Sequence, residues 1–193
     1  ANHMLCAGWL KRFAPDLIHE TYYSLHPVKS CTKPRVVTVY DMIHELFRDH
    51  FSTRDKTSML KRRAIDRADH VICISESTRR DLINLFGISE EKLSVVHLGF
   101  EQFVSDYEPN NKNAIPAKPY LLYVGNRGGY KNFSGFVRAV ALSERIKADF
   151  DICAFGGGGF SSMEKTLLSK LGFQSDQVRQ LGGDDKLLGY LYD

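Results

Sequence analysis

The residues best suited to chemistry lie at positions 120–133, YLLYVGNRGGYKNF, where an apolar strand pattern breaks into a glycine loop that leads into a helix. This loop contains Gly125 and Asn126 and carries the cations Arg127 and Lys131. Glycines let backbone amides approach a ligand, and a helix start favours an anion. A guanidinium fork and an ammonium add positive charge, so the loop predicts a pyrophosphate site. An ordinary turn with solvated cations is the alternative interpretation, because the spacing matches neither G-x-G-x-x-G nor the P-loop.

A second glycine cluster, FGGGGF at 155–160, follows another strand pattern and precedes another helix pattern. Gly156, Gly157 and Gly158 would offer backbone amides to a nucleotide. A flexible connection is the alternative, which the position at the carboxyl end of a strand makes weaker. Tyr22 and Tyr130 lie in or beside such loops and could stack on a sugar or a base.

Polar residues also follow strand patterns in the first half of the chain. Asp41 and His44 come after VVTVY, and His19 and Thr21 end the pattern PDLI in the same way. Open α/β sheets bind ligands at the carboxyl ends of their strands, so these side chains are candidates to orient a hydroxyl, transfer a proton or stabilise a developing cation. The alternative is that Asp41 caps a helix and His44 lies on the surface. Ser75, before ESTRRDLI, reads as an anion nest or, more simply, as a helix cap.

The composition is that of a globular protein. The 193 residues are 43% hydrophobic with a net charge of +3, which suits one large or two small domains and is too mild a charge to imply nucleic acid. The sequence has no run of roughly 18 to 20 apolar residues and no signal-peptide pattern, so the cytoplasm is the expected compartment. The four scattered cysteines predict reduced thiols, and we expect no metal site.

Two basic clusters lie on predicted helices, at 61–63 (KRR) and 79–80 (RR). We interpret both as solvated helix faces. A weak contact with an anionic membrane is the more specific alternative.

Strand and helix patterns alternate along the chain, which predicts an α/β fold with parallel strands. The expected strands are 15–20, 35–41, 69–75, 92–99, 120–126, 149–156 and 178–183, and the expected helices are 56–68, 76–86, 132–147, 162–171 and one from 184. Ser75 and Gly87 would cap the helix at 76–86. The polar, proline-bearing stretch 100–119 predicts a linker between domains at 1–99 and 120–193. The second domain is short of strands and the first begins without an obvious first βαβ unit, so we expect a fragment of a longer protein.

The order TVYDMIHELF, VICISESTRRDLI, VVHLGF, LLYVGNRGGYKNF, CAFGGGGF resembles the "group 1" retaining glycosyltransferases, a family 4-like group, over most of the chain. The resemblance implies the GT-B fold, with two Rossmann-like domains facing across a cleft. It also implies a nucleotide-diphosphate sugar as the donor and no essential metal or other cofactor.

The resemblance assigns roles to individual residues. Arg127 and Lys131 stand where the family grips the donor diphosphate, beside the donor-binding set Gly125, Asn126, Gly156, Gly157 and Gly158. Asp41 and His44 match residues that face the transferred sugar and the acceptor, with Tyr40 where many relatives have His. The acceptor-side candidates are His19, Thr21, Tyr22 and Ser75. The family's N-terminal glycine loop and its later pair of glutamates have no counterpart here.

The implied reaction transfers a sugar to an acceptor hydroxyl with retention, after domain closure, in bacterial polysaccharide or lipopolysaccharide synthesis. Mannose from GDP-mannose is one candidate donor, a glycan or lipid-linked molecule the expected acceptor, and the inner face of the membrane the expected location. This fragment by itself is expected to be inactive. The alternative is a non-catalytic sugar-nucleotide-binding or scaffold module, and a nicotinamide-dependent enzyme is disfavoured because no G-x-G-x-x-G is present.

Overall fold

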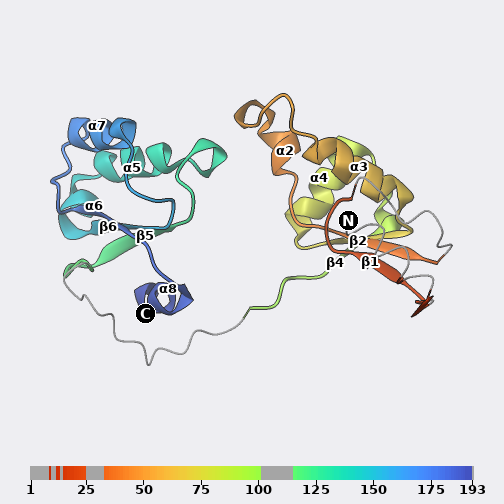
Figure 1. Cartoon of the computed structure of the whole chain (residues 1–193). Helices are drawn as coiled ribbons and strands as arrows, with labels where there is room; N and C mark the ends of the chain where they lie inside the picture. Colours follow the sequence, from red (N-terminus) through yellow and green to blue (C-terminus); the bar gives the residue numbers. More distant parts are fainter. Residues whose placement is uncertain (1–8, 10–11, 14, 25–32, 101–114, 193) are drawn as a thin grey trace. The chain divides into compact units, whose positions relative to one another are not determined.

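Both halves of the chain form parallel β-sheets in a computed structural model that describes residues 9, 12–13, 15–24, 33–100 and 115–192. The chain divides into two compact units, residues 1–100 and 101–193, and each has its own sheet (Figure 1). The predicted α/β fold class is therefore confirmed. The predicted boundaries at 1–99, 100–119 and 120–193 stay a prediction, because most of the proposed linker lies outside the described residues.

The first unit has a four-stranded sheet in the order β1-β2-β3-β4, with all neighbours parallel. The strands are Ile18–Glu20, Arg35–Val39, His70–Cys73 and Leu93–Val95. Each lies within a predicted strand and is shorter than it. The carboxyl ends of parallel strands lie at the same edge of a sheet. Val39 and Cys73, the last residues of β2 and β3, are register partners and lie side by side at this edge.

The helices of the first unit are α2 (Ile43–Leu46), α3 (Thr57–Arg67) and α4 (Glu76–Phe86), with 3₁₀ turns η1 (Arg48–His50) and η2 (Glu90–Lys92). Ile65 of α3 and Leu82 of α4 are fully buried against the sheet. Both predicted caps of α4 are confirmed: the Ser75 hydroxyl accepts from Thr78 N at 3.1 Å, and Gly87 ends the helix with φ of 64°. The sequence did not predict α2, which is too short to show a helical period.

The second unit has a three-stranded parallel sheet in the order β5-β6-β7. Its strands are Tyr120–Val124, Asp151–Phe155 and Val178–Leu181. Its helices are α5 (Phe133–Leu142), α6 (Glu144–Asp149), α7 (Ser162–Lys170) and α8 (Asp185–Tyr192), with η4 at Gly129–Lys131. The central strand β6 is buried along its whole length.

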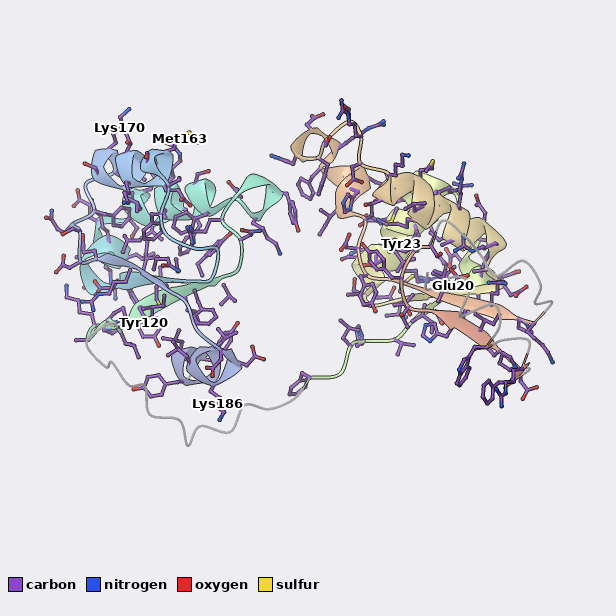
Figure 2. All side chains as sticks on the ribbon, in the orientation of Figure 1. Glu20, Tyr23, Tyr120, Met163, Lys170 and Lys186 are labelled. Carbon is purple, nitrogen blue, oxygen red and sulfur yellow. The ribbon has the colours of Figure 1, made fainter. Side chains whose placement is uncertain are left out.

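Alternate side chains of β6 pack against different helices. Ile152 and Ala154 join the core of α5 and α7, whereas Cys153 and Phe155 pack against α8. Successive side chains of a strand point to opposite faces, so helices cover both faces of this sheet, as Figure 1 shows. The Tyr120 hydroxyl also donates to the Leu191 carbonyl at 2.9 Å, which connects α8 to β5; Tyr120 is labelled in Figure 2.

The predicted helix at 132–147 is wrong as one element, because Ser143 divides it into α5 and α6. Ser143 has φ of −107° and ψ of 104°, outside the helical region. Its hydroxyl accepts from Ile146 N at 3.3 Å and so caps α6. A serine hydroxyl that bonds to nearby backbone competes with a continuous helix.

The two described cysteines are thiols in the two cores. Cys73 and Cys153 are fully buried. Burial raises the pKa of each thiol to about 11, so both are protonated at neutral pH. Cys6 and Cys31 lie outside the described residues.

Candidate functional site

In the second unit, Arg127 is enclosed by the glycine cluster 156–159. Its side chain is only 4% exposed. The Nε atom donates to Glu164 Oε1 at 2.7 Å. The two terminal nitrogens donate to the carbonyl oxygens of residues 156, 157, 158 and 159 at 2.8, 3.4, 2.8 and 3.0 Å. Arg127 therefore joins the loop after β5 to the loop after β6.

These contacts give the guanidinium a structural role within the second unit. The predicted contact of Arg127 with a donor diphosphate stays a prediction. In the structure its donors are directed at protein acceptors, and the Phe160 ring packs with its centroid 4.8 Å from the guanidinium carbon. The Arg127 contacts therefore hold the glycine loop 156–159 in one conformation.

The glycine loop has a conformation that exposes amides. Gly156, Gly157 and Gly158 have φ of 85°, 68° and 69°, in the left-handed region, and a Cβ on Gly157 would lie 2.9 Å from Arg127 Nη1. The chain has no cis peptide among the described residues, and in a trans peptide the C=O and the following N–H point in opposite directions. Because the carbonyls of 156–159 converge on Arg127, the N–H groups of 157–160 point away from it. No described residue accepts a hydrogen bond from these four groups.

The loop after β5 lies against this cluster. Gly125 has φ of 108°, and its N–H donates to the Phe155 carbonyl at 2.8 Å. The Tyr123 hydroxyl lies 2.9 Å from the Asn126 carbonyl and 3.1 Å from the Lys131 carbonyl, so it holds the two ends of the loop. Burial raises the pKa of Tyr123, which keeps its hydroxyl a donor. Lys131 itself is exposed, with Nζ 5.3 Å from the Tyr130 ring centroid.

Helix α5, which follows this loop, has an N-cap residue in the left-handed backbone region. Asn132 has φ of 53°, the left-handed region, and its side-chain oxygen accepts from Gly135 N at 3.1 Å. A Cβ on Gly135 would lie 2.5 Å from the Asn132 amide nitrogen. Asn132 thus caps α5 only because position 135 has no side chain.

In the first unit, Asp41 and His44 follow β2 as predicted, but both are engaged locally. Asp41 Oδ1 accepts from Ile43 N at 3.0 Å and shapes the entry to α2. The His44 ring stacks on Phe51 at 4.0 Å between centroids, with Nε2 3.9 Å from Asp55 Oδ2. His44 Nδ1 is buried and has no partner within the described part of the chain.

Lys61 is not on a solvated helix face, and that prediction is wrong. Its side chain is 1% exposed, and Nζ donates to Glu45 Oε2 at 2.6 Å and to the Asp41 carbonyl at 2.8 Å. The Tyr23 ring, labelled in Figure 2, lies 5.7 Å from Nζ, and burial raises the pKa of Tyr23 well above its usual range. Lys61 therefore fixes the chain segment that carries Asp41 and His44.

The other acceptor-side candidates do not form one cluster with Asp41. His19 lies within β1, and its Nε2 contacts Thr38 Oγ1 on β2 at 2.8 Å. Thr21 and Tyr22 follow β1 with exposed side chains. Ser75 serves as the α4 cap, so the simpler interpretation of this residue is confirmed.

A hollow of about 880 Å³ lies in the first unit between the 44–55 segment and helices α3 and α4. Its lining includes His44, Glu45, Phe51, Asp55 and Arg62. The sequence did not predict this hollow, because its walls come from α2, η1, α3 and α4 and no single motif contains them.

Two other arginines of the basic clusters, Arg62 and Arg79, form ion pairs with carboxylates of the first unit. Arg62 contacts Asp66 at 2.9 Å and the Phe86 carbonyl at 2.7 Å, and Arg79 contacts Glu90 at 2.7 Å. No helix within the described ranges is long and apolar enough to cross a membrane. The same residues contain no group of three or more metal-ligating side chains.

Comparisons with known proteins bear on both units. Residues 1–101 match a family model described as Glycosyltransferase Family 4. Solved structures of similar fold include a glycosyltransferase from Rickettsia africae ESF-5 (TM-score 0.63, 19% identity, 98% of this chain and 52% of that one). WaaG, a glycosyltransferase involved in lipopolysaccharide biosynthesis, matches with TM-score 0.61 and 16% identity over 96% of this chain and 53% of its own.

A third solved structure is an S. aureus TarM mutant in complex with Fondaparinux, alpha-GlcNAc-glycerol and UDP (TM-score 0.56, 11% identity, 95% of this chain and 37% of that one). No curated protein matches the chain. The chain thus spans about half or less of the length of these structures, and at such identities they show a shared GT-B fold. Since the family model covers more than half of the 193 residues, this chain belongs to glycosyltransferase family 4, a family of retaining enzymes.

Proposed function

We propose that this chain is part of an enzyme that moves a sugar from a nucleotide-diphosphate donor to an acceptor hydroxyl with retention, and that residues 101–193 bind the donor. The observation that carries the proposal is the glycine loop 156–159. Its carbonyls are gathered by Arg127, which leaves the N–H groups of 157–160 directed outward. A row of amides facing one way is a binding surface for an oxyanion such as a diphosphate.

The chemistry needed is stabilisation of a leaving diphosphate. Negative charge develops on the leaving group as the bond to the sugar breaks, and fixed donors that face this charge lower the barrier. The 157–160 amides would supply such donors, and the exposed ammonium of Lys131 would supply a positive charge. Arg127 contributes its charge from behind the loop. Asp41 and His44 are the residues that we assign to the transferred sugar and to the acceptor hydroxyl.

The finer assignments belong to the same proposal. UDP is a reasonable first donor nucleotide because the TarM structure contains it, and GDP-mannose is the alternative. Polysaccharide or lipopolysaccharide synthesis at the inner face of a bacterial membrane is supported by the likeness to WaaG. The acceptor would be a glycan or a lipid-linked sugar.

Calorimetric titration of the 193-residue chain with UDP, GDP, ADP and NAD tests donor binding. We expect a nucleoside diphosphate to bind and NAD not to bind. Lys131→Ala should weaken binding about tenfold, as loss of one charge-assisted contact does, whereas Lys186→Ala, at an exposed position of α8, should leave it unchanged. Equal affinity of the Lys131→Ala variant and the wild type would remove Lys131 from the site.

Turnover is tested separately in the full-length protein, by following nucleotide release from the nucleotide sugars with glycan acceptors. Binding without turnover at full length would favour the alternative, a non-catalytic sugar-nucleotide module.

A further inference from the structure

Glu164 joins the Arg127 side chain to the start of α7, the helix on which Met163 and Lys170 are labelled in Figure 2. No sequence motif pointed to this residue. Its Oε1 accepts from Arg127 Nε at 2.7 Å, and its Oε2 accepts from Ser161 N at 2.7 Å. The Ser161 hydroxyl accepts in turn from Glu164 N at 3.3 Å, which completes a capping box. Both carboxylate oxygens are therefore used.

The charge of Glu164 is needed where it lies. Arg127 is buried, and a buried cation without a counter-charge is strongly unfavourable. Among the described residues, Glu164 is the carboxylate that forms an ion pair with Arg127. Burial by itself would raise the pKa of Glu164, but the hydrogen bonds from Arg127 and Ser161 outweigh it and lower the pKa. The carboxylate is thus ionised at neutral pH.

The bond at Nε also sets the direction of the guanidinium. A carboxylate held at Nε fixes the plane of the guanidinium and leaves both terminal nitrogens to donate to the 156–159 carbonyls. Phe133 and Phe160 pack beside the guanidinium, with ring centroids 5.8 and 4.8 Å from its carbon, and restrict its movement. The Nε contact is the one hydrogen bond to this guanidinium, among the described residues, that does not come from the glycine loop, so it holds the fork independently of the loop that the fork orders.

We infer that Glu164 is a positioning residue for donor phosphate: it orients Arg127, which holds the glycine loop with its amides turned toward the ligand. This inference rests on the proposed donor role of residues 101–193. The inference goes beyond that donor role because it names Glu164, a residue that touches no ligand and acts through Arg127.

The first experiment compares UDP with uridine by calorimetry on the 193-residue chain. Glu164→Ala should lose about tenfold in UDP affinity, the size of one charged hydrogen bond, and keep its uridine affinity. Glu164→Gln, which keeps an acceptor oxygen, should fall between Glu164→Ala and the wild type. Ser161→Ala is the matched control, because it breaks the same capping box and leaves the Arg127 contact. Equal losses for UDP and uridine, or an equal loss in Ser161→Ala, would overturn the inference.

The second experiment needs no ligand and covers the case in which the wild type binds no UDP. By ¹⁵N NMR, the Arg127 Nε–H should exchange slowly in the wild type and in Ser161→Ala, and fast in Glu164→Ala, with shifted amide resonances at 157–160. Unchanged resonances in Glu164→Ala would show that Glu164 does not organise the loop. If the wild type binds none of UDP, GDP and ADP while these shifts occur, the proposed function and the donor role of Glu164 both fail, and only the loop-ordering contact remains.

Discussion

Each unit has a buried cation paired with one carboxylate, and the two pairs are built differently. In the first unit, Lys61 contacts Glu45 at 2.6 Å, and in the second, Arg127 contacts Glu164 at 2.7 Å. Lys61 adds one backbone carbonyl, that of Asp41, whereas Arg127 adds four carbonyls of the glycine loop. The ammonium fixes a point on the chain, and the guanidinium shapes a whole loop.

The anions differ as well. Glu45 Oε1 is buried and without a partner in the described part of the chain, whereas Glu164 uses both oxygens and is 22% exposed. Water can therefore reach Glu164 if its partner is removed, but hardly Glu45, which is 8% exposed. We therefore expect the Lys61 pair to matter most for stability and the Arg127 pair to matter most for ligand binding.

The largest effect should come from Lys61→Met. This change leaves Glu45 buried without a counter-charge, and we expect a loss of about 3–5 kcal/mol in the free energy of unfolding. Urea denaturation followed by circular dichroism measures it. Arg63→Met, at an exposed position of the same helix, is the control. The double variant Lys61→Met with Glu45→Leu should recover most of the loss, and failure to recover would show that the ion pair is not its source.

Arg127→Ala should destabilise the chain less, by about 2 kcal/mol, because Glu164 and the glycine carbonyls can then reach water. Thermal unfolding midpoints of Arg127→Ala and Lys61→Met, measured in the same buffer, compare the two losses of stability. A larger drop for Arg127→Ala than for Lys61→Met would contradict the proposed division between a structural pair and a ligand-ordering pair.

Tyr123→Phe should cost about 1 kcal/mol, since it removes the hydroxyl that contacts the Asn126 and Lys131 carbonyls and leaves the ring in place. Tyr120→Phe is a matched control, because it removes one hydroxyl contact on the same strand, to Leu191, away from the glycine loops. Weaker UDP binding only in Tyr123→Phe would link this hydroxyl to the donor loop.

The smallest effect concerns acid stability. Hydrogen bonds from Thr57 lower the pKa of Asp55, which lies beside His44, and the pKa of Glu164 is lowered by Arg127 and Ser161. Stability from such groups is present above the unfolded pKa values, 3.8 for Asp and 4.5 for Glu, and is lost as pH falls below them. Glu164→Gln and Asp55→Asn should each flatten this acid limb in urea titrations at successive pH values. An unchanged slope in Glu164→Gln would mean that its carboxylate is not held as the structure has it.

Patterns with a local cause were predictable from the sequence. Ser75 and Gly87 bound α4 because a hydroxyl and a left-handed glycine act within one helical turn. The parallel strands were predictable from their apolar runs. Ser143 was not recognised as a break, because a mid-helix serine can equally bond to its own helix and leave it continuous.

The chemistry of the site was only partly predictable. Both glycine loops and the cations beside them could be located, since glycine after a strand is a local signal. The partners of Arg127 could not, because Glu164 is 37 residues away along the chain and comes close only through β5-β6 pairing. The prediction that Lys61 is solvated was wrong for the same reason, because its partner Glu45 lies 16 residues away and on a helix too short to predict.

Asn132 and Gly135 have a consequence for how this loop can change over evolutionary time. Because the amide of Asn132 occupies the volume that a Cβ at 135 would need, the two positions form an interlocked pair. Alanine at 135 would push the Asn132 amide aside and remove the cap of α5, whereas glycine at 132 would keep the left-handed φ and avoid the clash. Homologues should therefore show correlated identities at these two sites, with asparagine at the first restricting the second to glycine.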